Sequence, residues 1–223
     1  MRDKLFTVSI FSLVLGMILT LIFLFSFNQS YYEKTYHRLN TAQEMTISED
    51  VLFEATDVLV HYILDEKDSL DFQFTQDGVS QEFFNQREKD HMVDVQSLYL
   101  NAKTVRNISF ALSIFLLTVC FLYRKEPLDI AHALKQVLIS FGLIILVIVV
   151  FALIDFNSFW IMFHELIFTN DLWLLDPNTD RLIQMVPLEF FMGLVYRIFT
   201  GVAILFIGLF SFMKFFERKY NHD

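Results

Sequence analysis

Four long apolar segments dominate the pattern of hydrophobic and polar positions along the chain. They cover residues 5–27, 107–123, 136–154 and 194–213, and each approaches the roughly 20 apolar residues that cross a hydrocarbon core about 30 Å thick. Only helices and closed barrels satisfy the backbone in lipid, and these continuous runs lack the alternation of barrel strands. The pattern therefore predicts an all-α integral membrane protein with four transmembrane helices.

The first segment predicts a membrane anchor, because it is too long for a signal peptide and no small-residue cleavage site follows it. Basic residues collect beside alternate ends of the four segments. They are Arg2 and Lys4 before the first, Arg124, Lys125 and Lys135 in the connection 124–135, and Lys214, Arg218 and Lys219 in the tail 214–223. The positive-inside rule makes these three regions cytoplasmic, so both termini are expected inside the cell.

The polar segments 28–106 and 155–193 are then expected outside the membrane, the first as a small, mostly helical cap and the second as an active-site loop. Thr46 followed by Glu49 is a capping-box pattern, and apolar residues recur behind it at helical spacing as far as Tyr62. Alternating residues before Asp77 and Gly78 predict a short hairpin. A second cap helix is expected to begin near Ser80.

That second helix raises a question of distance. If it ran straight into the second transmembrane segment, His91 would lie roughly 25 Å above the membrane. We therefore expect the chain to bend or break between Leu98 and Asn107. An unbroken helix would be expected to keep His91 away from the second outward segment, 155–193.

Composition supports a membrane protein and limits its partners. The chain is 55% hydrophobic and 17% aromatic, with a formal net charge of −9. Most of its acidic residues fall in the outward segments, which argues against nucleic acid and against simple attraction to anionic lipid headgroups. The single Cys120 excludes an intramolecular disulfide.

Two histidines have surroundings suited to proton transfer. His91 has Glu88 and Asp94 three residues away on either side, on one helical face, and an adjacent carboxylate can orient an imidazole and raise its basicity. His164 opens a segment rich in aromatic, amide and carboxylate side chains. The candidate supporting or substrate-binding residues are Glu88, Asp94, Trp160, Asn170, Asp171, Trp173, Asp176 and Arg197.

Other chemistries have weaker support in the sequence. His91, Asp94 and His164 could form a two-histidine, one-carboxylate metal set, but the segment HELIF lacks the second histidine of a metalloprotease helix. No nucleophilic-serine motif or phosphate-binding glycine loop is visible. A metal-dependent membrane hydrolase and a non-catalytic membrane sensor or assembly factor remain as alternatives.

Two motifs set among the four apolar segments resemble a known bacterial family. REKDHMVDV (87–95) and FHELIFTNDLWLLDPNTDRLIQMVPLEFF (163–191) are similar to those of the lipoprotein intramolecular transacylases. Val186 departs from the pattern, since a Phe is expected there.

The resemblance implies an acyltransferase of the bacterial cytoplasmic membrane. Such an enzyme moves the sn-2 acyl chain of a diacylglyceryl-modified lipoprotein to the α-amino group of its N-terminal Cys, giving a lyso-form lipoprotein. The resemblance makes His91 and His164 the catalytic residues, at the outer membrane interface, with no cofactor and no metal. The expected partners are diacylated lipoproteins and membrane lipid. The sequence does not decide which His is the base or what the oligomeric state is.

Overall fold

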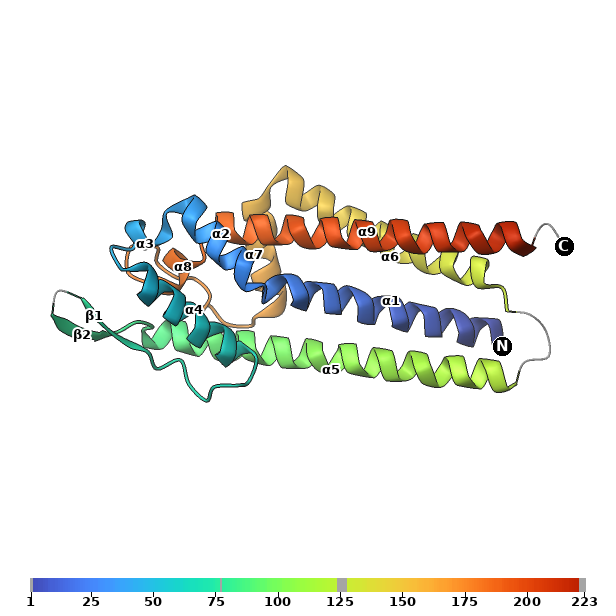
Figure 1. Cartoon of the computed structure of the whole chain (residues 1–223), viewed down its shortest axis with the longest axis horizontal. Coiled ribbons are helices and arrows are strands. Elements are labelled where there is room, and N and C mark those ends of the chain that lie inside the picture. Colours follow the sequence, from blue (N-terminus) through green and yellow to red (C-terminus); the bar gives the residue numbers. More distant parts are fainter. Residues whose placement is uncertain (1, 77, 124–127, 221–223) are drawn as a thin grey trace. The chain divides into compact units, whose positions relative to one another are not determined.

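Helices account for most of the chain in the computed structural model, which describes residues 2–76, 78–123 and 128–220. In chain order the elements are α1 (Arg2–Ser26), α2 (Gln29–Leu39), α3 (Thr41–Glu44), α4 (Glu49–Ile63), β1 (Gln73–Gln76), β2 (Val79–Glu82), α5 (Gln86–Leu122), α6 (Ile130–Ile154), α7 (Phe156–Ile167), α8 (Arg181–Met185) and α9 (Leu188–Tyr220). Figure 1 shows this order. Arg124, Lys125 and Asp77 lie outside the described residues.

Four of the described helices are long and apolar enough to cross a membrane. They are α1, α5, α6 and the part of α9 from Leu188 to Phe215. Many of their large apolar side chains are exposed, including Leu143 and Val147 on α6, as expected for helix faces that contact lipid. The predicted fold class, an all-α integral membrane protein with four transmembrane helices, is confirmed.

The chain forms two compact units. The first combines residues 1–24, 102–156 and 196–223, and it contains most of the apolar helical segments. Its core joins side chains of four helices, among them Val14 of α1, Cys120 of α5, Val137 of α6 and Met213 of α9. Small residues permit the close approach of helices in such bundles, and a Cβ added at Gly16 would lie 2.8 Å from the Phe110 ring.

The second unit, residues 25–101 and 157–195, contains both candidate histidines. The predicted cap helix is confirmed as α4, with Leu52, Ala55 and Leu59 buried along one face. The N-cap residue of α4 is Ser48, whose side chain accepts a hydrogen bond from the Val51 amide. The expected Thr46–Glu49 capping box is therefore wrong. Thr46 instead takes a positive φ of 57° in the preceding turn.

The expected hairpin is confirmed, and it explains where α5 begins. β1 and β2 pair antiparallel, with Gln76 opposite Val79 and Gly78 at φ 79° in the turn. Because residues 79–82 form a strand, the helix expected from Ser80 begins six residues later, at Gln86. Asn85 and Glu88 cap it reciprocally: each side chain accepts a hydrogen bond from the other residue's amide, at 2.6 and 3.0 Å.

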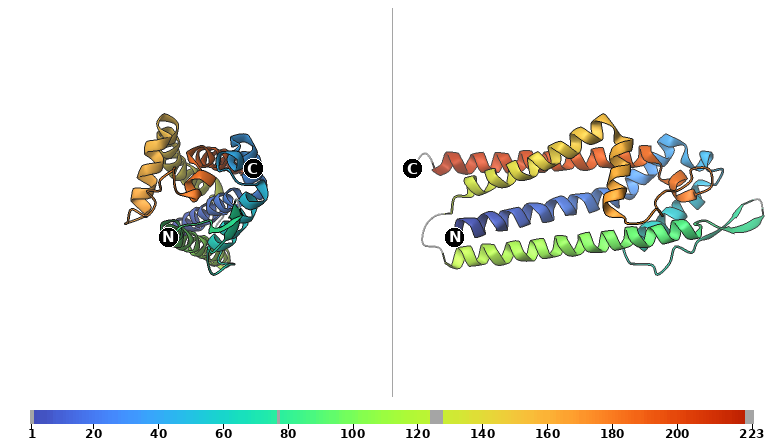
Figure 2. Two further views of the ribbon diagram at one scale, coloured as in Figure 1. Left: turned by 90° about the vertical axis from the view of Figure 1, so that its left-hand side faces the viewer. Right: turned by 180° about the vertical axis from the view of Figure 1, so that it is seen from behind.

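α5 is a single unbroken helix, as both side views show (Figures 1 and 2). The bend expected between Leu98 and Asn107 is therefore wrong. At 1.5 Å per residue the helix is about 55 Å long, well beyond a hydrocarbon core of about 30 Å. The apolar segment that the sequence predicts to span the membrane begins at Asn107, and the N-terminal turns of α5 with His91 precede it.

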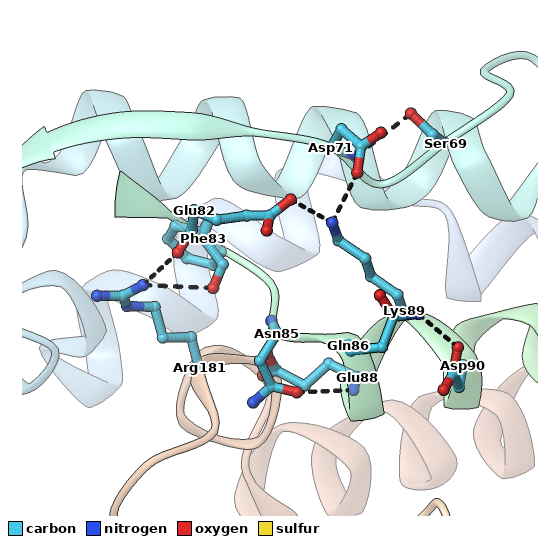
Figure 3. Close-up of polar contacts among 10 residues, drawn as sticks. All are labelled: Ser69, Asp71, Glu82, Phe83, Asn85, Gln86, Glu88, Lys89, Asp90 and Arg181. Atoms are coloured by element: carbon cyan, nitrogen blue, oxygen red, sulfur yellow. Dashed lines mark hydrogen bonds and ion pairs between the residues drawn. The ribbon is translucent and has the colours of Figure 1, made fainter. Parts of the chain in front are cut away.

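Polar contacts tie the hairpin to the N-terminal end of α5 and to α8 (Figure 3). Lys89 pairs with Asp71 at 2.6 Å and with Glu82. Arg181, the first residue of α8, donates to the carbonyl oxygen of Glu82 at 2.7 Å. Its guanidinium also lies over the Phe74 ring. The hairpin is thereby linked both to the start of α5 and to α8.

An aromatic cluster joins α2 to the start of α9. Tyr31, Tyr32 and Tyr36 surround Phe190, which is only 1% exposed. The Tyr31 hydroxyl donates a 2.6 Å hydrogen bond to the Phe190 carbonyl oxygen. The range 155–193, treated above as a loop, thus contains α7, α8 and the first turns of α9.

Candidate active site

His91 and His164 lie against each other. His91 is on the second turn of α5 and His164 on the last turn of α7, and their ring centroids are 6.2 Å apart. An unbroken α5 was expected to keep them apart, and that reasoning failed because His164 sits on a helix of its own. Both residues are buried, with 7% and 8% of their surfaces exposed. The structure therefore forms one histidine pair from two distant parts of the sequence.

The backbone of α7 sets the tautomer of His164. Its Nδ1 lies 2.8 Å from the carbonyl oxygen of Trp160, one turn earlier. A carbonyl oxygen can only accept, so Nδ1 carries the hydrogen and, in the neutral ring, Nε2 has the free lone pair. The ring of His164 is thereby prepared to accept a proton at Nε2.

His91 has different surroundings. Its Nδ1 is buried and has no hydrogen-bond partner. Burial lowers the pKa of His91 to about 4, and the nearby His164 and Arg87 also lower it, while Asp94 opposes them. Burial likewise lowers the pKa of His164, opposed by the hydrogen bond to Trp160. Both rings are therefore neutral at neutral pH.

Aromatic side chains enclose the pair. Phe168 contacts both rings, with centroids 5.3 Å from His91 and 5.7 Å from His164. Trp173 packs against His164 at 4.9 Å, and Trp160 meets its edge at 4.8 Å. Trp160 also stacks on Phe191 at 4.4 Å. Such an apolar enclosure excludes water and strengthens the electrostatic interactions inside it.

Asp94 bonds to a different group from the one expected. It was predicted to orient His91, but its carboxylate accepts a 2.8 Å hydrogen bond from the side-chain amide of Asn170. Asn170 also shapes its own segment: its side-chain oxygen accepts from the Leu172 amide and its carbonyl from the Trp173 indole. Asp94 acts on His91 through its charge, and on the His164 segment through Asn170.

Glu88 is a buried structural link. It is 1% exposed, and its two oxygens accept hydrogen bonds from the backbone amides of Asn85 and Leu182. Burial raises its pKa, which these two bonds oppose. With both oxygens occupied, Glu88 supports the site by joining α5 to α8 and does not present a free oxygen to a ligand.

The remaining predicted residues have separate positions. Asp171 is exposed and pairs with Arg87. Asp176 accepts hydrogen bonds from the backbone and side chain of Asn178, so its contacts stay within the turn before α8. Arg197 is half-buried on α9 and belongs to the other unit. A role for Arg197 at the histidines stays a prediction.

Arg87 was missed as a site residue. It lies one turn before His91, donates to the carbonyl oxygen of Asp171, and has a buried Nε without a partner. It is also one of the charges that act on His91. The available signal was its spacing, four residues before His91 in the motif REKDH, which places both on one helical face.

A metal centre has no ligand set within the part of the chain that the structure describes. There, no group of three or more His, Cys, Asp or Glu side chains is arranged to hold an ion. The combination of His91, Asp94 and His164 considered above is not such a group. The geometry instead favours chemistry carried by the two imidazoles.

The fold and the site define a helical integral membrane enzyme with a buried histidine pair. The model of the family "Lipoprotein intramolecular transacylase Lit" matches residues 7–191, so the chain belongs to that family, and it is an acyltransferase of bacterial membranes that acts on lipoproteins. The resemblance noted in the sequence is thereby confirmed.

Solved structures of the lipoprotein intramolecular transacylase Lit from Bacillus cereus share the fold. One is 21% identical, covers 97% of this chain and 98% of its own, and has a TM-score of 0.78. Two others have one histidine replaced by arginine or by alanine. The first is 22% identical, with coverages of 98% and 94% and a TM-score of 0.70. The second is 21% identical, with coverages of 99% and 96% and a TM-score of 0.73. No curated protein sequence matches the chain significantly.

Proposed function

We propose that His91 and His164 together catalyse transfer of the sn-2 acyl chain of a diacylglyceryl-modified lipoprotein to the α-amino group of its own N-terminal Cys. The observation that carries this proposal is the pairing of two buried imidazoles at 6.2 Å inside an aromatic enclosure. Neutral imidazoles accept and donate protons at little cost, which suits aminolysis of an ester.

We assign the base to His164. The amine nitrogen attacks the ester carbonyl carbon, a C–N bond forms, and the carbonyl oxygen becomes an oxyanion. His164 takes the proton released by the amine at Nε2, because Nδ1 is occupied by the Trp160 carbonyl. The hydrogen bond to that carbonyl also stabilises the protonated ring. His164 is thus better suited than His91 to hold a proton during the reaction.

His91 serves as the hydrogen-bond donor to the oxyanion. A neutral imidazole can donate one N–H, and a donor in an enclosed apolar site is worth far more than one in water. When the bond between the carbonyl carbon and the glyceryl oxygen breaks, that oxygen takes the proton from His164. The products are an amide at the Cys nitrogen and a free glyceryl hydroxyl, with no net gain or loss of protons.

Positioning supplies much of the rate. The amine and the ester belong to one lipoprotein, so the enzyme only has to hold them in a reactive geometry, and such orientation contributes several kcal/mol. Trp160, Phe168 and Trp173 are the surfaces we assign to holding the acyl chains. This assignment rests on their contacts with the two histidine rings.

The proposed orientation follows from charge. The positive-inside rule favours cytoplasmic termini and a histidine pair at the outer face of the membrane, where lipoproteins carry their lipid. Labelling of single cysteines placed at Lys67 and at Lys135, in a Cys120→Ser background, tests this orientation. Impermeant reagent should reach the first position and not the second in intact cells.

Mass spectrometry of the N-terminal lipopeptide tests the function. A diacylated lipoprotein is expressed with the wild type, His91→Ala or His164→Ala in a host that lacks other N-acylating activity. Fragmentation should place one chain on nitrogen with the wild type and both chains on glyceryl oxygens with either variant. His132→Ala is the control, since His132 is exposed near the start of α6. Full transfer by both site variants would overturn the proposal.

A further inference from the structure

The histidine pair is covered by a short irregular stretch that follows α7. This cover segment, residues 168–174, places Phe168 against both rings and Trp173 against His164. Each histidine is less than one-tenth exposed. A lipopeptide that carries two acyl chains cannot bring its amine and its ester to rings so enclosed unless the cover moves.

Two side chains of α5 hold the cover segment from opposite sides of His91. Arg87, four residues before His91, donates to the Asp171 carbonyl oxygen and lies 3.7 Å from the Asp171 carboxylate. Asp94, three residues after His91, accepts a 2.8 Å hydrogen bond from the side chain of Asn170. Asn170 also accepts hydrogen bonds from the Leu172 amide and the Trp173 indole, both within the cover segment itself. The two attachments therefore bracket the catalytic ring on one helical face.

The attachments are suited to repeated opening. The Asp171 side chain is 78% exposed and that of Arg87 is 40% exposed, and Asn170 is exposed as well. Exposed ion pairs contribute little because water screens them. The inner face of the segment, by contrast, is aromatic and packs on the rings. A segment with an apolar inner face and weak outer attachments closes firmly enough to exclude water and still opens.

We propose that residues 168–174 form a gate over the histidine pair, that Arg87 and Asp94 are its latches, and that the gate opens to admit the diacylated N-terminus of the substrate. This inference rests on the proposed function for the identity of the substrate. Arg87 is a positioning residue in this scheme, acting on His164 through the cover segment. Asn170 is the part of the gate that receives the Asp94 latch.

Accessibility of the rings tests the gate without requiring activity. The full-length protein in lipid nanodiscs is treated with diethyl pyrocarbonate near neutral pH, and modification of each histidine is followed by mass spectrometry. Arg87→Gln and Asp94→Ala should each speed modification of His91 and His164 by roughly two- to fivefold, the factor that a weak exposed pair contributes to an equilibrium. The exposed His37 is the internal standard.

Matched variants separate opening from unfolding. Lys89→Gln removes a positive charge two residues from Arg87, where the side chain pairs with Asp71 and Glu82 away from the gate, and it should leave both rates at the wild-type level. Asp94→Asn keeps an oxygen for Asn170 and should also leave them unchanged. If any substitution near the start of α5 loosened the fold, Lys89→Gln and Asp94→Asn would also be modified faster than the wild type.

The outcomes distinguish the gate from the catalytic proposal. Arg87 and Asp94 are not latches if the histidines of the double variant Arg87→Gln with Asp94→Ala are modified at the wild-type rate. The same follows if the histidines are modified as fast in Asp94→Asn as in Asp94→Ala. Neither result would bear on whether the histidines are catalytic. If the rates rise as expected but His91→Ala and His164→Ala proteins still transfer the acyl chain, the catalytic proposal fails and the gate stands.

Discussion

The carbonyl oxygen of Trp160 accepts a 2.8 Å hydrogen bond from Nδ1 of His164, one helical turn later. Both residues belong to α7. The sequence pattern does not predict this helix, because many aromatic residues obscure its helical spacing. The bond fixes which nitrogen of His164 is available for chemistry. It needs no carboxylate partner, because the backbone of the same helix supplies the acceptor.

The lowered pKa values of the two histidines predict the pH dependence of transfer. Burial keeps His91 neutral down to pH of about 4 and lowers the pKa of His164 as well. As pH falls, the first group to take up a proton is therefore the substrate amine, whose pKa is roughly 8. The logarithm of the single-turnover rate should rise with a slope of one below that value. A second break near 6.5, steepening the slope to two, would show that an active-site imidazole titrates normally.

Replacement of Glu88 should loosen the support beneath the site. Glu88→Gln keeps one acceptor oxygen and turns an amide donor toward a backbone N–H of Asn85 or Leu182. A buried donor left unsatisfied costs about 1–3 kcal/mol. Thermal unfolding of the full chain in detergent should show this loss. Glu54→Gln, on the exposed side of α4, is the control and should unfold like the wild type.

A close approach between α2 and α9 gives a paired prediction. A Cβ added at Gly193 would lie 2.6 Å from the Tyr31 hydroxyl oxygen. Gly193→Ala should therefore destabilise the protein by about 1–3 kcal/mol through overpacking. Because Tyr31→Phe removes the clashing oxygen, the double variant should recover part of this loss. Strict additivity of the two changes would contradict the contact.

Gly16 and Gly142 offer a matched comparison within the membrane helices. The Phe110 ring occupies the space beside Gly16, whereas nothing lies within 4 Å of a Cβ at Gly142. Gly16→Ala should lower the thermal stability by about 1–3 kcal/mol, and Gly142→Ala should be neutral or slightly stabilising. Equal stability of the two variants would mean that α1 and α5 do not pack at Gly16.

Much of the fold could be predicted because membranes and amphipathic helices impose simple periodicities. The four apolar helices follow from long apolar runs, and α4 follows from apolar residues spaced three and four apart. The hairpin follows from alternating residues before a Gly turn. The N-cap residue of α4 was wrongly predicted because Thr46 and Ser48 are both hydroxyl residues just before the helix. Only the backbone conformation shows which of them caps it. α7 was missed because its dense aromatics hide a helical stripe.

The sequence predicted the two histidines of the candidate site, but not the contacts of the residues around them. His91 and His164 stand out by their neighbours, and the structure pairs them. Spacing alone suggested that Asp94 orients His91, since residues three apart share a helical face. The competing partner, Asn170, comes from a distant segment, and no local pattern reports it. The spacing of Arg87 from His91 was visible, but its acceptor, a backbone oxygen at residue 171, was not.

The histidine pair also has a consequence for the biosynthesis of the protein. His91 and His164 are contributed by stretches that the ribosome makes at different times, separated by the whole of α6. A nascent chain in which α5 is complete contains His91 but not yet His164. If both imidazoles are catalytic, as proposed, acyl transfer begins only after α7 has been made and packed beside His91, and an unfinished chain is inactive in the bilayer.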